Sequence, residues 1–206
     1  MIDTAGIDPA WAATLSCSGL ATYSAAAKLI PIPSDEWVAV IGAGGLGLMA
    51  IAMLRAFGHE RIIAVDVDEK KLSATGLTGT VDARKTGAEK KLTEIAGGPI
   101  YGAMDFVGSS ETTRLALGVL GKGGRLVLVG LYGGEIQLSL VTTVQRALTI
   151  QGSHLGSLAE LQSVVALARA GKLKPIPVET RPLSEVNRTL DELQKGRIVG
   201  RVVVEI

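Results

Sequence analysis

The sequence predicts an α/β fold built on a doubly wound, six-stranded parallel sheet. The first observation behind this prediction is that short runs such as VAVI, IIAV and LVLV are apolar throughout instead of alternating with polar residues. Continuous apolar strands are typical of parallel sheets that helices cover on both faces. The second observation is that segments with helical periodicity separate these runs along the chain, as parallel strands require.

The individual elements follow the apolar runs in chain order. The predicted strands cover residues 37–41, 61–66, 102–106, 125–129 and 148–152, with a weaker candidate near 80–82. Residues 46–54 carry no charge, which predicts a helix that is buried on nearly all sides. A later helix is predicted from Leu158 onward, because Ser157 and Glu160 form a capping box at its start and Gly171 is suited to its end.

The two ends of the chain do not belong to this sheet. Residues 1–30 contain two helical stretches of small residues and are interpreted as a remnant of a domain junction. Residues 31–175 form the predicted sheet domain. Residues 176–206 hold a helical pattern and a final strand, RVVVEI, for which the completed sheet offers no partner. We expect this segment to return towards a domain that is absent from the chain.

Composition narrows the possible function classes. The 206 residues are 47% hydrophobic and 20% charged, enough to bury a core, and the formal net charge is +1. Basic residues are not clustered and aromatic residues make up only 3%, so we expect no nucleic-acid partner. The apolar stretches end well before the ~20 residues of a membrane span, and MIDTAGIDPAW lacks the basic start of a signal peptide. A soluble, cytoplasmic protein without a membrane partner is therefore expected.

A glycine motif follows the first predicted strand. Gly42, Gly44 and Gly47 form G-x-G-x-x-G between a buried strand and a helix. Gly42 permits a tight turn, Gly44 lets a diphosphate approach the backbone, and Gly47 lets the helix pack closely on the strand. Backbone N–H groups near Gly45 and Leu46 then face the anion at the start of the helix. The motif predicts a dinucleotide site, and a tight turn without a ligand is the alternative.

An acidic residue ends the next strand. Asp66 lies 19 residues beyond Gly47, since 66 − 47 = 19. A carboxylate at this place can accept hydrogen bonds from the adenosine ribose and would repel a 2′-phosphate, which favours NAD over NADP. The alternative is that Asp66 caps the following helix, but Asp68 is better placed for that.

Taken together, several segments resemble the medium-chain dehydrogenase/reductase family, specifically its zinc-type alcohol dehydrogenases. The resemblance covers nearly the whole chain and implies a Rossmann coenzyme-binding domain with a C-terminal return, while the N-terminal catalytic domain is missing. The segments that carry it are LSCSGLATYSA, VAVIGAGGLGLMA, AVDVDEKKL, AMDFVGSSET, GGRLVLVGLYGG, LTIQGSHLGS and GRIVGRVVVEI.

The resemblance implies roles along an NAD molecule. The pyrophosphate would lie on the glycine turn, with Arg201 nearby, unless Arg201 is a solvated charge at the end of a strand. Asp66 and Lys71 would lie beside the adenosine ribose. The remaining contacts would border the cofactor and its nicotinamide end. The residues implied are Gly42, Gly44, Gly45, Leu46, Gly47, Asp66, Lys71, Phe106, Val107, Val129, Gly130, Leu131, Ser153, Leu155 and Arg201.

Cys17 is the only cysteine, so an internal disulfide is impossible. By resemblance, Cys17 matches a ligand of the family's catalytic zinc. One thiolate cannot hold such a zinc, which needs three protein ligands, so zinc is expected only with ligands missing from this chain. The alternative is a small buried hydrophobe. The family usually has Thr four residues after this Cys, where this chain has Ala21 followed by Thr22, which puts a hydroxyl contact to the nicotinamide in doubt.

The two histidines have no predicted catalytic role. His59 lies in a predicted helix-to-strand turn and is expected at the surface, and His154 is expected in an exposed loop. No Ser–His–Asp or paired-carboxylate pattern supports hydrolase chemistry. We therefore leave the catalytic residues unassigned.

Three functions agree with these observations. The first is the NAD-binding part of a zinc-type alcohol dehydrogenase, inactive alone, whose whole enzyme would exchange hydride between an alcohol or carbonyl and NAD(H). The second is a zinc-independent enone or quinone reductase of the same superfamily. The third is a non-catalytic NAD-sensing module. We also expect a homo-oligomer, which the family resemblance implies to be a dimer, that pairs through the edge strand near 148–152.

Overall fold

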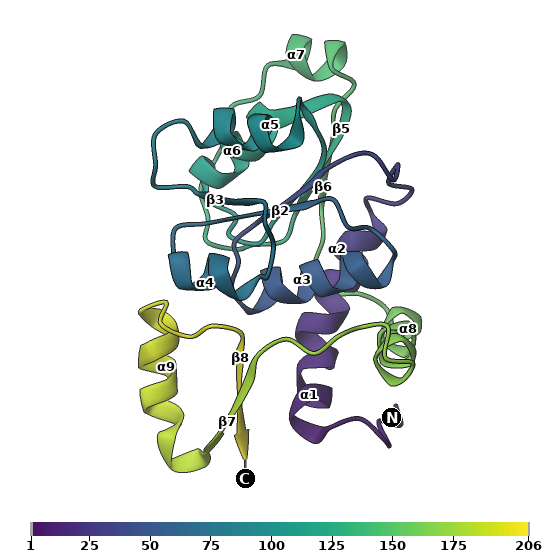
Figure 1. Cartoon of the computed structure of the whole chain (residues 1–206), viewed down its shortest axis with the longest axis vertical. Helices are drawn as coiled ribbons and strands as arrows, with labels where there is room; N and C mark the ends of the chain where they lie inside the picture. Colours follow the sequence, from purple (N-terminus) through teal and green to yellow (C-terminus); the bar gives the residue numbers. More distant parts are fainter. Residues whose placement is uncertain (1, 206) are drawn as a thin grey trace.

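The computed structural model describes residues 2–205 and contains the predicted six-stranded parallel sheet (Figure 1). The strand order is β3-β2-β1-β4-β5-β6, and every neighbouring pair is parallel. This order confirms the doubly wound α/β fold. The strands are β1 (Val38–Ile41), β2 (Ile62–Asp66), β3 (Thr80–Asp82), β4 (Ile100–Asp105), β5 (Leu120–Leu128) and β6 (Thr149–Gly152).

Helices cover both faces of the sheet. Alternate residues of β1 separate into two apolar cores, with Val38 and Val40 in one and Ala39 and Ile41 in the other. The first core also contains side chains of α2, α3 and α8, and the second contains those of α5 and α6. The helices of this part are α1 (Pro9–Thr14), a π-helix η1 (Leu15–Gly19), α2 (Leu20–Ala27), α3 (Gly45–Ala56), α4 (Glu69–Ala74), α5 (Ala88–Ala96), α6 (Ser110–Val119), α7 (Leu140–Gln145) and α8 (Leu158–Arg169).

Most predicted boundaries lie within two residues of the observed ones, but β5 begins five residues before the expected 125–129. The reason is a register shift between β4 and β5. Ile100 pairs with Leu120, and Gly102 pairs with Arg125. The glycine-rich residues between them run beside the start of β4 as an irregular strand, which an apolar pattern does not reveal. The capping box of Ser157 and Glu160 is present as predicted.

The C-terminal part forms a second, small sheet. Strand β7 (Val178–Pro182) pairs in parallel with β8 (Arg201–Glu205), and the 3-10 helix η2 (Leu183–Glu185) and α9 (Val186–Gln194) connect them. The last strand therefore has a partner within the chain, which corrects the expectation that the partner lies in an absent domain. Ile206, the end of the predicted strand, lies outside the described residues. In Figure 1 this β-α-β unit lies below the large sheet, beside α1.

His59 is buried, with 6% of its surface exposed, so the expected surface position is wrong. Its Nε2 lies 3.1 Å from the Arg61 carbonyl oxygen. Burial lowers the pKa of the imidazole below its usual value, although the Arg61 carbonyl acts in the opposite direction. The residue fills the turn between α3 and β2 as a neutral side chain.

Within residues 2–205, no helix has the length and apolar character needed to cross a membrane.

Candidate functional site

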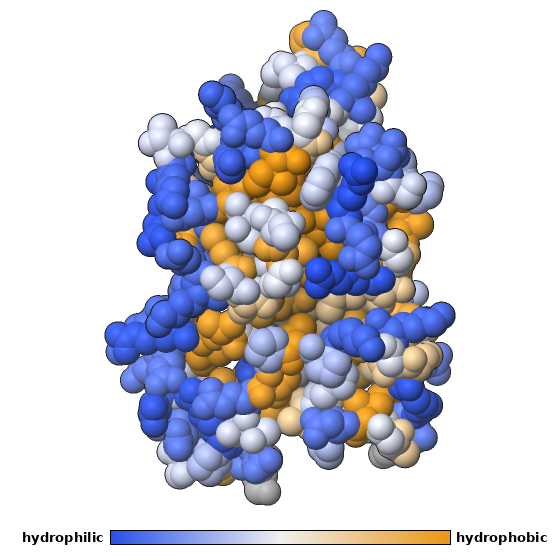
Figure 2. Space-filling model, viewed as in Figure 1, coloured by the Kyte–Doolittle hydropathy of each residue, from blue (hydrophilic) through white to orange (hydrophobic). Residues whose placement is uncertain are grey.

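Two adjoining pockets open at the carboxyl ends of the strands, where the strand order reverses between β1 and β4. Ligands of doubly wound sheets bind in this kind of crevice. The glycine pocket, about 530 Å³, is lined by Gly42, Gly44, Gly45, Leu46, Gly47, Asp66, Lys71, Phe106, Val107, Leu131, Tyr132, Leu193 and Arg201. The apolar pocket, about 850 Å³, shares Val107 and Tyr132 with it. Figure 2, which has the same view as Figure 1, shows apolar surface gathered in the middle of the molecule.

The glycine turn is shaped by close approach of backbone to backbone. Gly42 has φ +91°, a conformation that side chains disfavour. A Cβ on Gly47 would overlap the Gly42 carbonyl group. A Cβ on Gly44 would meet nothing within 4 Å, so this glycine leaves open space at the start of α3. The sequence thus predicted a steric need at Gly42 and Gly47 and open space at Gly44, and the structure has both.

Gly45 is required for a reason outside the motif. A Cβ there would lie 2.5 Å from both the Arg201 Nε and the Gly200 carbonyl oxygen. The start of β8 is therefore packed against the first turn of α3. This approach joins segments that are more than 150 residues apart, so the local sequence around Gly45 contains no sign of it.

Arg201 lies in the wall of the glycine pocket with its Nε buried. Among the described residues, this Nε has no hydrogen-bond partner. Burial lowers the pKa of the guanidinium, and nearby Cys17 acts in the opposite direction. Arginine keeps its charge at neutral pH, so the pocket wall contains a half-buried cation whose Nε has unused donor capacity. Arg201 is the first residue of β8 and is half-buried, so it is not a fully solvated charge at the strand end.

Asp66 is held in place by backbone donors. Its Oδ2 accepts the Ala43 N–H at 2.6 Å, and its Oδ1 accepts the Asp68 N–H at 2.9 Å. Asp68 is the N-cap of α4 and accepts from the Lys70 and Lys71 N–H groups, so the helix-cap alternative for Asp66 is wrong. The carboxylate of Asp66 retains free lone pairs towards the glycine pocket, since each oxygen can accept more than one hydrogen bond.

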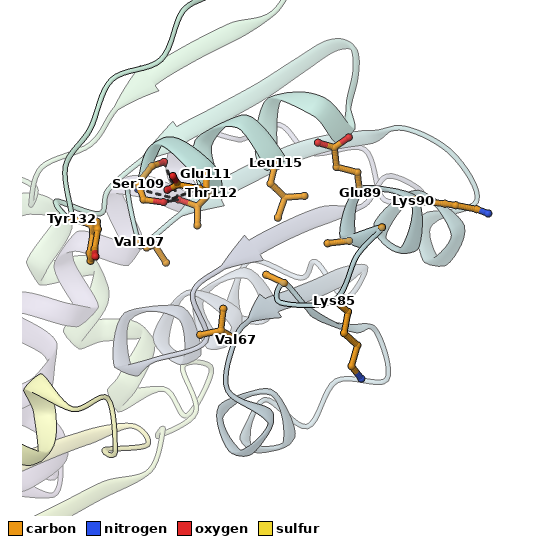
Figure 3. A pocket seen from close by; sticks show the side chains of 13 residues that line it. Val67, Lys85, Glu89, Lys90, Val107, Ser109, Glu111, Thr112, Leu115 and Tyr132 are labelled. Atoms are coloured by element: carbon orange, nitrogen blue, oxygen red, sulfur yellow. Dashed lines mark hydrogen bonds between the residues drawn. The ribbon is translucent and has the colours of Figure 1, made fainter.

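The apolar pocket was not predicted. In Figure 3, Val67 and Leu115 face one another across it, while Lys85 and Lys90 extend away from it. Val67 directly follows Asp66 and is 53% exposed, and Tyr132 is 82% exposed at the boundary of the two pockets. An apolar residue directly after a strand-ending aspartate is a local signal that could have been used. The approach of α6 depends on tertiary packing and leaves no such signal.

A second unpredicted residue, Asp105, organises the loop after β4. This carboxylate is fully buried. Its Oδ1 accepts the Val107 and Gly108 N–H groups, both at 2.9 Å, and its Oδ2 accepts the Thr112 and Thr113 hydroxyls at 2.9 and 3.0 Å. Asp105 is therefore saturated within the protein and fixes the position of Val107, which lines both pockets.

Four of the predicted cofactor residues do not line the glycine pocket. Val129 and Gly130 donate their N–H groups to the Asp105 carbonyl oxygen at 2.9 and 3.0 Å. The Ser153 N–H donates to the Leu128 carbonyl oxygen at 2.8 Å and so continues the β5–β6 ladder. Leu155 is 41% exposed and has φ +50°. These residues follow the carboxyl ends of β5 and β6.

Cys17 lies in the π-helix and is exposed, so the alternative interpretation of this residue as a small buried hydrophobe is wrong. Across residues 2–205, no three His, Cys, Asp or Glu side chains come together as a metal site. Cys17 alone does not satisfy zinc. The hydroxyl of Thr22 donates to the Ser18 and Gly19 carbonyl oxygens at 2.7 and 3.1 Å, so it is directed into its own helix. His154 is exposed, as expected.

Comparisons with known proteins identify the family of this chain. A family described as zinc-binding dehydrogenase matches residues 45–170. An alcohol dehydrogenase of Geobacillus stearothermophilus is 32% identical over 203 residues, which cover 97% of this chain and 59% of that protein. An NAD-dependent alcohol dehydrogenase of Sulfurisphaera tokodaii is 33% identical over 197 residues, 94% of this chain and 57% of that protein. The chain thus spans less than two thirds of the length of these curated relatives.

Solved structures give the same result. The alcohol dehydrogenase of Aeropyrum pernix has a TM-score of 0.86 at 35% identity, with 94% of this chain and 57% of that chain covered. A cobalt- and zinc-bound alcohol dehydrogenase of Pyrobaculum aerophilum has a TM-score of 0.79 at 29% identity, with 94% and 57% covered. Both the predicted fold and the predicted resemblance are confirmed.

The packing of Gly45 gives a first prediction. Gly45→Ala should lower the free energy of unfolding by about 1–3 kcal/mol, because its Cβ would displace backbone at Gly200. Gly44→Ala is the matched control and should change it by no more than about 1 kcal/mol, since its Cβ meets open space. Chemical denaturation of the two variants measures the difference. Equal losses in both would contradict the assigned role of Gly45.

Proposed function

Because this chain belongs to the zinc-binding dehydrogenase family, we propose that it binds NAD(H) as the coenzyme-binding part of an alcohol dehydrogenase. The cofactor would extend along the crevice from the apolar pocket, across the glycine turn, to the ends of β5 and β6. When bound, it would accept hydride from an alcohol or return hydride to a carbonyl carbon. The residues of this chain would bind and orient it.

The observation that carries this proposal is the buried Nε of Arg201 beside the glycine turn, which has no hydrogen-bond partner within residues 2–205. An uncompensated buried cation is costly unless an anion joins it. The forked donors of a guanidinium match phosphate oxygens. The first turn of α3 contributes free backbone N–H groups, because its N-cap, Gly44, has no side chain to satisfy them. A pyrophosphate fits this combination of cation and N–H groups.

The adenosine half would lie on the β2 side. The free lone pairs of Asp66 are suited to the ribose hydroxyls, with Lys71 in the same pocket wall. The flat adenine ring would lie between Val67 and Leu115, which bound the apolar pocket. The fixed negative charge of Asp66 would disfavour a 2′-phosphate, so we propose NAD as the preferred cofactor.

The nicotinamide half would lie on the β4–β6 side. Phe106, Val107 and Leu131 line the glycine pocket there. Val129 and Gly130 follow the end of β5, and Gly130 packs against the Val107 backbone. The backbone of Ser153 and Leu155 would face the carboxamide group, as the family resemblance implies. With the pyrophosphate at the glycine turn after β1, the strand order β1-β4-β5-β6 lets the nicotinamide half of the cofactor continue along the carboxyl ends of β4, β5 and β6.

The chemistry of the whole protein is part of the same proposal. The family is described as zinc-binding, and we propose that Cys17 contributes one ligand to a zinc whose other ligands lie outside these 206 residues. The substrate would be a small alcohol or carbonyl compound. The residues described here do not form a zinc site, so we derive no catalytic step through the metal.

Arg201 provides the direct test. Arg201→Met should raise the dissociation constants for NADH and for ADP-ribose together by about tenfold, because both ligands carry the pyrophosphate. The free energy of unfolding without ligand should not fall, since the change removes the buried Nε that has no hydrogen-bond partner within residues 2–205. Isothermal titration and denaturation measure the two quantities. Arg197→Met, an exposed arginine on the same segment, is the control. Unchanged affinity in Arg201→Met would exclude the proposed pyrophosphate position.

Cofactor preference tests Asp66. Asp66→Ala should weaken NADH binding by about tenfold and narrow the preference for NADH over NADPH, because an acceptor and a repulsive charge are removed. Asp82→Ala is the control, since Asp82 ends β3 directly beside Asp66 but pairs with Arg84. Fluorescence titration with both nucleotides gives the ratio. A ratio that stays at its wild-type value in Asp66→Ala would refute the ribose assignment.

We also propose a homo-oligomer that pairs through the β6 edge. In the part of the chain that the structure describes, β6 pairs with β5 alone, and the adjoining α7 exposes Leu140, Val141 and Val144. Exposed apolar surface beside an open strand edge favours association with a second copy.

Sedimentation velocity tests this surface. The wild-type chain should sediment as a dimer, and Val144→Asp should shift it towards the monomer because a charge enters an apolar contact. Leu190→Asp changes an equally apolar, 57% exposed residue on α9 and should leave the dimer intact. A wild-type monomer at high micromolar concentration would rule out this interface.

A further inference from the structure

A hydrogen-bonded cluster connects α2 to the loop that follows β6. The Lys28 ammonium donates to the Ser24 carbonyl oxygen at 3.2 Å, to the Ser24 hydroxyl at 2.8 Å and to the Ser153 hydroxyl at 3.1 Å. These three bonds use the three N–H donors of the ammonium group. Ser24 and Ser153 are buried, and Lys28 is half-buried. A side chain near the C-terminal end of α2 thus holds a residue that lies 125 positions further along the chain.

The other end of the same loop is fixed by Glu160. Its Oε2 accepts the Ser157 N–H at 2.6 Å as part of the capping box of α8. The Ser157 N–H and hydroxyl, the Ser24 hydroxyl and the charge of Lys28 together keep the pKa of the Glu160 carboxyl below its usual value. Glu160 therefore offsets the charge of Lys28 from across the loop.

The loop between these two anchors is strained. Leu155 has φ +50°, an unusual conformation for a side chain with a Cβ. A Cβ on Gly156 would lie 2.7 Å from Leu20 Cδ1, so the loop also packs directly on α2. Strained backbone of this kind persists only where the surroundings determine it, and such sites are concentrated at ligand-binding positions. The Lys28 cluster is the polar part of those surroundings.

We propose that Lys28 is a positioning residue for the nicotinamide end of the cofactor. Through Ser153, its ammonium holds the backbone of residues 153–155 in the geometry that receives the carboxamide. This inference rests on the proposed function, since it needs the nicotinamide to lie at this loop. Lys28 itself makes no contact with the cofactor.

The positioning role makes a selective prediction. Lys28→Met should raise the dissociation constant for NADH by about fivefold to tenfold, because one charged donor anchors the loop. ADP-ribose lacks the nicotinamide, so its dissociation constant should stay within about twofold of wild type. Ser153→Ala removes only the accepting hydroxyl and should shift NADH affinity in the same direction. The double variant should lose no more than the larger single loss, because both changes remove one interaction.

Isothermal titration with NADH and with ADP-ribose measures the ratio of the two dissociation constants for each variant. Lys122→Met, an exposed lysine in β5 at the opposite end of the sheet, should leave the ratio unchanged. The proposal is overturned when this ratio keeps its wild-type value in Lys28→Met and Ser153→Ala. An unchanged ratio arises either because neither ligand weakens or because both weaken equally, and the second case indicates a merely structural cluster. If the wild-type chain binds NADH no more tightly than ADP-ribose, the nicotinamide does not lie at this loop. That result would contradict both the proposed nicotinamide position and this inference.

Discussion

The crevice depends on backbone segments that approach one another where no Cβ can be accommodated. The Gly42 carbonyl fills the space of a side chain at Gly47, and the start of β8 fills the space of one at Gly45. The first contact sets α3 close to β1. The second sets the C-terminal β-α-β unit on the first turn of α3 and thereby brings Arg201 into the pocket wall. One short turn therefore determines both the floor and one wall of the site.

Two aspartates at strand ends arrange the rest of the crevice in different ways. Asp105 accepts four hydrogen bonds in a fully buried position, so its lone pairs are used within the protein. Asp66 accepts two and retains lone pairs towards the pocket. The first carboxylate is a structural centre for the loop after β4, and the second is oriented and still free to bind. Such preorganisation reduces the entropy that a ligand must lose when it orders the site.

The sequence predicted what local patterns encode. Continuous apolar runs identified the strands, and the spacing of three glycines and Asp66 identified the turn and its neighbour. It did not predict the burial of His59, because the turn that encloses this side chain has the polar residues of a surface loop. The partner of β8, the need for glycine at position 45 and the unpaired Nε of Arg201 also escaped prediction. Each of these depends on segments that meet only after folding, so no window of the sequence contains both sides of the contact.

The helix that runs from α1 through η1 to α2 connects two parts of the crevice. Cys17 lies in its π-turn near Arg201, where it opposes the larger effect of burial, which lowers the pKa of that guanidinium, while Lys28 holds the loop after β6. The Thr22 hydroxyl, one turn after the π-helix, donates hydrogen bonds to the carbonyl oxygens of Ser18 and Gly19. Because an α-helix turns about 100° per residue, the wider turn changes the direction of Cys17 relative to Lys28. The π-turn thus allows one helix to present its thiol near the pocket wall while its lysine reaches Ser153.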